Sequence, residues 1–554
     1  MARWFNVAGP CKPDIHYMLP AAARLPAVSS LVDQQSYFVL HAPRQSGKTT
    51  AMLNIAQELM AAGRYVAVLV SAEVGAPFGD APDLAEQAML DSWQADMRYQ
   101  LAPEFYPQQW PTGITGRHIG AFLGAWASQC PLPLVVFIDE IDALRDTTLI
   151  SVLRQLRDGF RRRPGAFPWA LALVGLRDVR DYKVASGGSE RLHSTSPFNI
   201  KTRSLTLGNF TFDDVTALYQ QHTADTGQVF EHAAIQEVMQ LTQGQPWLVN
   251  ALAKVAVEEI SSNLSQAITV SIISQAKEEL IRRQDTHLDS LAERLREPRV
   301  RSIIEPILSG QALGNVPPDD LRFVQDLGLV RLEPEGGLVI ANPIYREVLP
   351  QVLASTAIAS LPQIVPSWLS PQGSLDIPHL LEAFLAFWRQ HGEPLLATSP
   401  YAEIAPHVVL MAFLHRVANG GSTIEREYAI GRDRMDLLLT YGSQRLAIEI
   451  KVWRDHRPDP LAAGLAQIDS YLLGLGLDSG WLVIFDQRRN QAPIAERTTT
   501  FFAQTPAQHE VTVIRAQGML QSNLILHKAE AEAAATCEEH LNHQNAKTLA
   551  IASA

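Results

Sequence analysis

A short segment near the N-terminus carries residue types that bind phosphate. APRQSGKT (residues 42–49) has the spacing of a Walker A loop, with Ala42 where the first glycine usually stands. It follows an apolar run and opens a helical pattern, so its backbone N–H groups would face a phosphate at a helix N-terminus. We expect Lys48 to reach the β- and γ-phosphates and Thr49 to ligate Mg²⁺. The residues expected to bind nucleotide here are Pro43, Arg44, Gln45, Ser46, Gly47, Lys48, Thr49 and Thr50.

A later apolar strand ends in two carboxylates that would complete this site. VVFIDE (135–140) places Asp139 at the end of the strand, where it would hold Mg²⁺ through water. Glu140 follows and would polarise the water that attacks the γ-phosphate. A chance GKT triplet is the alternative, and the correctly placed Asp-Glu pair argues against it.

Two further features fit a nucleotide site and have ordinary explanations as well. Arg177 follows the fourth apolar strand, where it would sense the γ-phosphate, or it is a surface arginine. Gly244-Gln245-Pro246 interrupts a helical segment. In one interpretation Pro246 lies at the nucleotide, and in the other the tripeptide only breaks the helix. The run RRR (161–163) could supply an arginine to a neighbouring copy, but a solvated loop is the better interpretation.

A second set of ionisable residues lies in RMDLLLTYGSQRLAIEIK (434–451), two apolar runs joined by a turn. In adjacent antiparallel strands, Glu449 and Lys451 share a face and Asp436 lies beside them. Two close carboxylates favour a hard cation such as Mg²⁺ or Mn²⁺, and the lysine would orient water for attack on a phosphodiester. The alternative is a solvated strand face or a cross-strand salt bridge.

Length, charge and cysteine content limit the classes of protein to which this chain can belong. The chain has 554 residues and a formal net charge of -12, which excludes a protein coated with nucleic acid over its whole surface but not a local basic groove. Its three cysteines lack CxxC spacing, so neither a disulfide framework nor a zinc knuckle is expected. No secretory signal and no membrane-spanning run is found, and we expect a soluble, cytoplasmic protein.

The elements that would position the first site are apolar strands alternating with helices. Such runs occur at 36–41, 64–73, 131–142 and 169–178, and continuous apolar strands fit a mostly parallel sheet covered on both faces. Helices then dominate to about residue 285. Short helices and two strands around Gly336-Gly337 follow, an order that indicates a winged helix.

The N-terminal part resembles a known group of ATPases. HAPRQSGKT, FIDEID, a strand ending at Arg177 and a lid with Gly244-x-Pro246 are similar to AAA+-like and STAND-like P-loop ATPases. The opening FNVAGP…DIHY (5–17) resembles the N-terminal lead of a bacterial subgroup of AAA-like proteins. The resemblance covers about residues 1–355. It implies that ATP and Mg²⁺ bind and that the nucleotide state sets conformation or assembly, with a homo-oligomer as the expected form.

The C-terminal part resembles PD-(D/E)XK nucleases of the RecB-like branch. The pattern is Asp436, Glu449 and Lys451, with Met435 where proline is usual. The elements expected around it are a helix at 402–418, a strand at 424–430, the two strands above, a helix at 461–475 and strands at 479–486 and 509–516. The resemblance implies Glu403 as an extra metal ligand beside Asp436 and Glu449. It also implies a catalytic role for Gln467, which shares a helix face with Tyr471.

The expected fold is therefore an α/β multidomain protein. Its expected parts are a three-layer P-loop ATPase core (1–208), a helical lid (209–285), a winged-helix domain (286–355), a linker (356–378), a restriction-endonuclease-like α/β domain (379–516) and a flexible tail (517–554).

The function expected from these parts is an ATPase that controls a Mg²⁺-dependent nuclease. We expect nucleic acid, in particular DNA, as the substrate, a possible protein trigger and no membrane. By resemblance alone, the role would be bacterial defence against phage or foreign DNA. The alternative is a nucleotide-switched scaffold that binds DNA or protein, with a C-terminal module that binds without cutting. A translocase is disfavoured, because no helicase-type motif follows FIDEID.

Overall fold

The computed structural model places the chain in two compact units, Met1–Ile303 with Gly314–Tyr345, and Ile304–Leu313 with Arg346–Ala554. The residues that it describes are 3–107, 111, 113, 116–177, 200–283, 294–308, 313–333, 336–349, 368–370, 374–398, 410, 413–414, 422–430, 433–486, 488 and 498–517. Side chains of 146, 390–398, 422–436 and 517 are outside this description. Every helix within the described part is too short or too polar to span a bilayer.

The first unit is built on a five-stranded parallel sheet with the order β2-β3-β4-β1-β5. The strands are β1 (Tyr37–His41), β2 (Val66–Ser71), β3 (Leu134–Asp139), β4 (Ala170–Gly175) and β5 (Arg203–Thr206). The four strands predicted from apolar runs are confirmed, and β5 is an addition. The phosphate loop and the acidic end of β3 lie at the same sheet edge, because β1 and β3 both flank β4 and run parallel to it.

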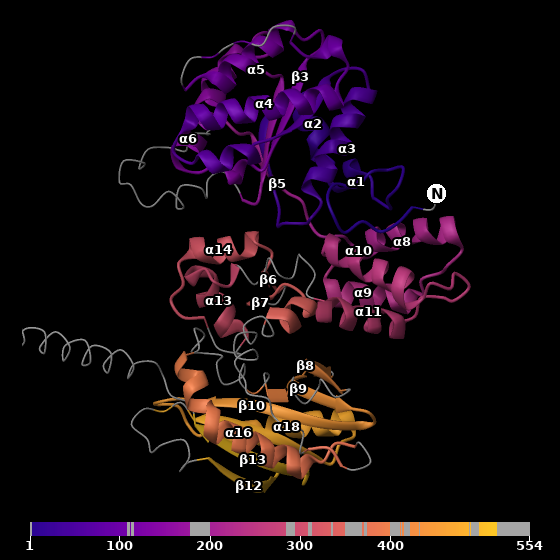
Figure 1. The fold of residues 1–554 in the computed structure, drawn as a ribbon, viewed down its shortest axis with the longest axis vertical. Coiled ribbons are helices and arrows are strands. Elements are labelled where there is room, and N and C mark those ends of the chain that lie inside the picture. The colour runs from indigo at the N-terminus through magenta and orange to yellow at the C-terminus, as the bar shows by residue number, and fades with distance from the viewer. Residues whose placement is uncertain are drawn as a thin grey trace, which may run out of the picture. The chain divides into compact units, whose positions relative to one another are not determined.

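Alternating residues of the same strands enter two different hydrophobic cores, so the sheet is covered on both faces (Figure 1). One core takes Val39 and Val136, and the other takes Phe38, Val135 and Phe137. The helices around the sheet are α1 (Ala21–Arg24), α2 (Ala27–Asp33), α3 (Lys48–Ala61), α4 (Pro82–Gln100), α5 (His118–Gln129) and α6 (Asp146–Gly159). This arrangement confirms the predicted three-layer core.

The rest of the first unit is mainly helical. The segment predicted as a lid contains α8 (Phe212–Thr226), α9 (His232–Thr242), α10 (Pro246–Val255) and α11 (Val270–Arg283). After it come the first part of α13 (Pro298–Leu308), whose residues from Ile304 on are assigned to the second unit, then α14 (Pro318–Asp326) and the antiparallel pair β6 (Val330–Leu332) and β7 (Leu338–Ile340). Short 3-10 or π turns lie at Glu73–Phe78, Pro103–Phe105, Ile141–Ala143, Phe160–Arg162 and Ala256–Ile260. The short helices and the two strands predicted for this segment are present, and the assignment to a winged-helix domain stays a prediction.

The second unit contains a six-stranded mixed sheet with the order β12-β13-β11-β10-β9-β8. Its strands are β8 (Ser422–Ile430), β9 (Asp433–Tyr441), β10 (Gln444–Trp453), β11 (Ser479–Asp486), β12 (Thr499–Gln504) and β13 (Glu510–Gln517). Strands β8 to β10 are antiparallel neighbours, whereas β10, β11 and β13 run parallel to one another. The predicted strands are confirmed, and β12 is an addition.

Helices pack against both faces of this sheet. The core on one face includes residues of α16 (Ile377–Thr398), and the core on the other includes residues of α18 (Leu461–Leu475). Helix α18 lies close to β11, because a Cβ on Gly464 would meet the Leu482 side chain at 2.6 Å. The close approach holds α18 over the face of β10 that carries Glu449. Part of the predicted linker (356–378) is described and is packed rather than free: Trp368 and Leu375 are buried in the core that includes α16, and α16 itself begins at Ile377. The rest of that linker, most of the helix expected at 402–418 and the tail from residue 518 lie outside the described residues.

Candidate functional site

The phosphate loop joins β1 to α3 and is closed on itself by its lysine. Gly47 has φ +88°, the left-handed region that glycine adopts without strain. Lys48 is buried, and its Nζ donates to the carbonyl oxygens of Ala42 and Pro43, each at 2.9 Å. Burial lowers the pKa of Lys48, while the nearby carboxylates, Glu140 first among them, oppose that shift. The ammonium group is thus held where a phosphate could replace the loop carbonyls.

The two predicted magnesium ligands lie together at the ends of α3 and β3. Thr49 donates from Oγ1 to Oδ2 of Asp139 at 2.6 Å, although the two residues are far apart in sequence. Burial raises the pKa of Asp139, and the hydrogen bond from Thr49 opposes this rise. A hydroxyl and a carboxylate are hard oxygen ligands, so this pair fits Mg²⁺ beside a nucleotide.

Glu140 lies next to the magnesium pair in a backbone conformation uncommon for its type. Its φ is +52°, which turns the chain sharply after β3. Burial raises the pKa of Glu140 to about 6, helped by the negative charges of Asp142 and Asp139. The residue lines a groove of about 420 Å³ together with Lys48 and Thr49. The position suits a general base for water at the γ-phosphate.

A separate cavity of about 290 Å³ adjoins this groove and shares Gly9, Gln45, Gly47 and Thr50 with it. Its other walls come from the N-terminal lead, from α1 and α3, and from α10. Asn6, Val7 and Ala8 line it from the lead, and Pro246 and Trp247 line it from the lid. We call this space the base-side cavity, because it adjoins the groove in which the phosphates of a nucleotide are expected. Pro246 lines it, and its role in nucleotide binding stays a prediction.

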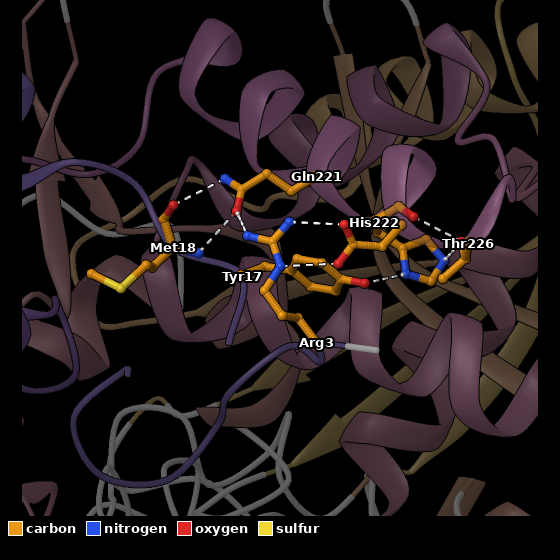
Figure 2. Close-up of polar contacts among 7 residues, drawn as sticks. Arg3, Tyr17, Met18, Gln221, His222 and Thr226 are labelled. Atoms are coloured by element: carbon orange, nitrogen blue, oxygen red, sulfur yellow. Dashed lines mark hydrogen bonds and ion pairs between the residues drawn. The ribbon is translucent and has the colours of Figure 1, made fainter. Parts of the chain in front are cut away.

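The N-terminal lead is anchored to lid helix α8 through a polar cluster (Figure 2). Arg3 donates from Nε and Nη2 to both carboxylate oxygens of Asp225, at 2.9 and 3.0 Å. Gln221 donates to the Met18 carbonyl at 2.9 Å, and the Tyr17 hydroxyl lies 3.3 Å from Nδ1 of His222. Burial lowers the pKa of His222, so the neutral imidazole is favoured in the fold.

The same lead is also bonded to the phosphate loop and to α10. The Cys11 N–H donates to the Thr50 hydroxyl at 3.0 Å. Trp247 donates from Nε1 to the Val7 carbonyl at 2.8 Å. The base-side cavity therefore depends on three segments distant in sequence. Sequence reasoning assigned no binding role to Asn6, Val7 or Trp247, and the only signal was the resemblance of the lead to AAA-like proteins.

Backbone geometry explains why a glycine stands at position 244 in the lid tripeptide Gly244-Gln245-Pro246. Gly244 has φ +71°, and a Cβ there would lie 2.0 Å from the Phe210 carbonyl oxygen. The Gln245 side chain accepts from the Leu248 N–H at 2.6 Å and so caps α10, in which Pro246 is the first residue. Its Nε2 also reaches the Gln45 carbonyl at 3.5 Å. The tripeptide is a helix break that also contacts the phosphate loop.

Arg177 lies just beyond β4 but is engaged by the segment after the lid. Its guanidinium carbon is 4.2 Å from the centre of the Phe323 ring on α14. In the run Arg161–Arg163, Arg162 pairs with Asp158 at 2.9 Å, and Arg163 stacks on Phe160 at 3.5 Å. Arg163 also donates to the Gln35 carbonyl and lies over the Tyr37 ring, so the contacts described for this run are with the start of β1 and with its own neighbourhood, not with the residues that line the groove.

The second predicted site centres on Lys451, at the same face of β10 as Glu449. Lys451 Nζ lies 2.5 Å from Oε1 of Glu449 and donates to Oε1 of Gln467 at 2.6 Å. Gln467 in turn donates to the Tyr471 hydroxyl at 2.6 Å. Glu449 is fully buried, whereas the Lys451 side chain is 24% exposed. Four predicted residues thus form one hydrogen-bonded row from β10 to α18.

The remaining members of this set are only partly described. Leu437 of β9 pairs with Ile448 of β10, so Asp436 and Glu449 are the next residues along the two strands. The side chain of Asp436, and the whole of Glu403, lie outside the described residues. Among the side chains that are described, no group of three or more His, Cys, Asp or Glu could hold a metal ion.

Comparison with protein families found one match. Residues 122–350 match the family of AAA-like domains, a span that includes β3, Glu140, the lid and the segment after it. No curated protein matches the chain.

Several solved structures are similar to the chain. A Walker-type ATPase of Pyrococcus abyssi is 14% identical over 62% of this chain and 99% of its own, with a TM-score of 0.44. The ORC2 protein of Aeropyrum pernix is 16% identical over 61% and 93%, with a TM-score of 0.35. The RuvB Holliday junction branch migration motor of Thermotoga maritima is 15% identical over 59% and 92%, with a TM-score of 0.32.

At these identities and TM-scores, nothing about activity or partners follows from the solved structures. The family match and the geometry around Lys48, Thr49, Asp139 and Glu140 support one conclusion. Residues 122–350 are similar to AAA-like domains, and the first unit has a parallel-sheet α/β core with a phosphate loop between β1 and α3.

Proposed function

We propose that the chain is an ATP-controlled, metal-dependent nuclease. The observation that carries the nuclease part is the row formed by Glu449, Lys451, Gln467 and Tyr471, with distances of 2.5, 2.6 and 2.6 Å between neighbours. The ammonium group has three N–H donors, and Glu449 and Gln467 accept two of them, so its position on β10 is fixed from two sides. The row holds the partly exposed Lys451 side chain against the buried carboxylate of Glu449.

The residues that would hold a metal at this site are Asp436 and Glu449, with Glu403 as a further candidate. A bound Mg²⁺ or Mn²⁺ would polarise a phosphodiester and favour an attacking hydroxide. Lys451 would donate a hydrogen bond to the water or the phosphate, and Gln467 would keep the ammonium group in place. Glu449 is buried and acidic, so a cation near it would relieve the cost of burying its charge.

The ATPase part would supply control. Thr49, Asp139 and Glu140 form a set suited to binding Mg²⁺ with ATP and to hydrolysing it. The N-terminal lead and the lid close the base-side cavity, so nucleotide binding would fix their relative position. We propose that this nucleotide-dependent state, in the manner of a STAND-like switch with a winged helix and a homo-oligomeric form, determines when the nuclease site acts. DNA as the substrate, and defence against phage as the role, rest on resemblance alone.

One experiment tests the proposal as a whole. The full chain and its variants Lys48→Ala, Glu140→Gln, Asp436→Ala and Lys451→Met are incubated with linear, supercoiled and single-stranded DNA and with RNA. Each reaction contains Mg²⁺ or Mn²⁺, with or without ATP. Glu510→Gln is the matched control, since Glu510 is an exposed carboxylate on β13 of the same sheet.

The expected result is cleavage by the wild type and by Glu510→Gln, and none by Asp436→Ala or Lys451→Met. Lys48→Ala should lose the dependence of cleavage on ATP. Absence of cleavage on every substrate, or equal cleavage by Lys451→Met, would remove the nuclease from the proposal and favour the nucleotide-switched scaffold. Identical behaviour of Lys48→Ala and the wild type would remove ATP control.

A further inference from the structure

A third cavity lies against the phosphate loop and belongs to neither site. It has a volume of about 270 Å³ and is enclosed by the loop, by the segment after β5, and by residues 325–345 of the same unit. Of the described residues, Arg44 is the one that lines both this cavity and the phosphate groove. The cavity has no described lining residue in common with the base-side cavity. A nucleotide in the first site therefore does not fill it.

The lining of this cavity is cationic. It includes Arg44, Arg294 and Arg331 and no aspartate or glutamate, in a chain whose net charge is -12. Within the described part of the chain, Arg44 makes no hydrogen bond or ion pair. Three guanidinium groups around one small volume create a positive potential. Glu297 and Glu333, which do not line the cavity, pair with Arg294 and Arg331 and offset part of it, whereas Arg44 keeps its charge toward the cavity and the groove.

The guanidinium group of Arg331 has a buried N–H donor without a hydrogen-bond partner among the described residues. This donor is Nε, whereas Nη2 reaches Glu333 at 3.4 Å. Arg294 pairs with Glu297 at 2.7 Å through Nη1. Buried donors in folded proteins are almost always satisfied by protein, water or ligand. An acceptor in the cavity would satisfy this one.

The walls of the cavity are firmly packed, so the space is not a sign of loose structure. Gly328 has φ +74°, and a Cβ there would lie 2.8 Å from the Pro43 side chain. Asn342 is buried and accepts from the Tyr345 N–H at 2.8 Å. Pro43 of the phosphate loop therefore contacts Gly328, which lies just before β6, at the wall of the cavity. The cavity stays open although the segments around it are in close contact.

We infer that this cavity binds a small phosphate-bearing molecule, distinct from the ATP of the neighbouring groove. Guanidinium groups recognise phosphate oxygens through paired N–H donors, and a doubly charged phosphate matches three arginines better than a single carboxylate does. The volume of about 270 Å³ lies just below the range of roughly 300–1,000 Å³ found for sites of drug-sized ligands, which suits a smaller molecule such as a sugar phosphate or free phosphate.

The ligand would be coupled to the ATPase through Arg44. This residue lines both the cavity and the phosphate groove, so its guanidinium group can interact with a ligand in either space. A phosphate paired with Arg44 would change the field at the groove, and by linkage ATP would change the affinity for the phosphate. The cavity is thus a site for an effector, and a molecule bound there would contact both the phosphate loop and residues 325–345.

Binding is tested on the full chain with Mg²⁺ and a non-hydrolysable ATP analogue, which occupy the phosphate groove. Ribose 5-phosphate and inorganic phosphate are titrated by calorimetry, with ribose as the uncharged control. The variants are Arg331→Gln and Arg294→Gln, and Arg331→Lys keeps the charge if Arg331→Gln fails to fold. Arg322→Gln is the matched control, since Arg322 lies on α14 and does not line the cavity.

The expected result is binding of the phosphate compounds, but not of ribose, by the wild type and by Arg322→Gln. Affinity should fall about tenfold in Arg331→Gln and in Arg294→Gln, the loss expected for one charged hydrogen bond. Tighter binding of ribose 5-phosphate identifies a phosphorylated small molecule, and equal binding identifies free phosphate. No binding, or equal affinities in all variants, would overturn the inference.

Discussion

The guanidinium group of Arg177 stacks on the ring of Phe323, with its central carbon 4.2 Å from the ring centre. Arg299 stacks on the same ring at 3.4 Å. Phe323 is buried in α14, and Arg177 follows β4, the strand beside the phosphate loop. The residue expected to sense the γ-phosphate is therefore held by the segment after the lid.

Phe323→Leu is expected to speed ATP hydrolysis. Leucine keeps apolar bulk in the α14 core but removes the ring, and a cation–π contact contributes about 0.5–2 kcal/mol. Release of Arg177 toward the groove should then raise the steady-state rate of phosphate release by about 2- to 10-fold at saturating ATP. The rate is measured with the full chain at neutral pH.

The control for this prediction is the same substitution in an Arg177→Ala background. Arg177→Ala alone should hydrolyse ATP no faster than the wild type, and adding Phe323→Leu should change nothing further. If Phe323→Leu accelerated both backgrounds equally, the ring would act on hydrolysis through packing rather than through Arg177.

ATP hydrolysis should fall as the pH decreases through about 6, because Glu140 must be ionised to act as a base. Burial raises its pKa to about 6, above the ordinary value of 4.5. The folded chain consequently binds more protons than the unfolded chain between these values, and this group lowers stability as the pH rises through that window. The rate constant at saturating ATP is measured from pH 5 to pH 8.

Glu140→Gln should abolish hydrolysis at every pH while leaving ATP binding intact, which equilibrium binding of a labelled nucleotide checks. Glu73→Gln, a substitution of another carboxylate that lines the groove, should leave the midpoint of the acid limb in place. A midpoint near 4.5 in the wild type would show that Glu140 is not the group that titrates.

Much of the first site could be predicted from sequence because its determinants are local. The loop 42–49 and the strand ending at Asp139 each have a fixed internal geometry, and parallel order brings β1 and β3 to the same sheet edge. The pairing of Glu449 and Lys451 was equally local, since period 2 in a strand fixes their common face.

The base-side cavity could not be predicted in this way. It depends on contacts such as Arg3 with Asp225 and Trp247 with Val7, between segments more than 200 residues apart. The short strands β5 and β12 were also missed, because β5 has only one buried residue and β12 is an exposed edge strand. Neither shows the apolar pattern that predicts a strand.

Gly244→Ala is expected to destabilise the lid strongly. The substitution places a Cβ 2.0 Å from the Phe210 carbonyl oxygen and forces alanine into a left-handed conformation. The conformation alone costs about 1–2 kcal/mol, and relief of the clash must displace the backbone between Phe210 and α10. The expected result is a lower thermal midpoint and weaker ATP binding, measured by calorimetry on the full chain.

Gly227→Ala separates the two causes. Gly227 ends α8 with φ +78°, and a Cβ there would meet nothing within 4 Å. This variant should lose only the conformational term of about 1 kcal/mol and should bind ATP normally. Equal losses in the two variants would mean that the contact between Gly244 and Phe210 is unimportant for the lid.

Gln467→Leu should reduce the proposed nuclease activity without preventing folding. The side chain accepts from Lys451 at 2.6 Å and donates to Tyr471 at 2.6 Å, so its loss leaves the ammonium group held by Glu449 alone. Residues that orient a catalytic group commonly contribute about 10- to 100-fold, and a loss of this size in the cleavage rate is expected. Tyr471→Phe, which removes only the outer hydroxyl, should have a smaller effect. A rate unchanged by Gln467→Leu would show that Glu449 positions Lys451 unaided.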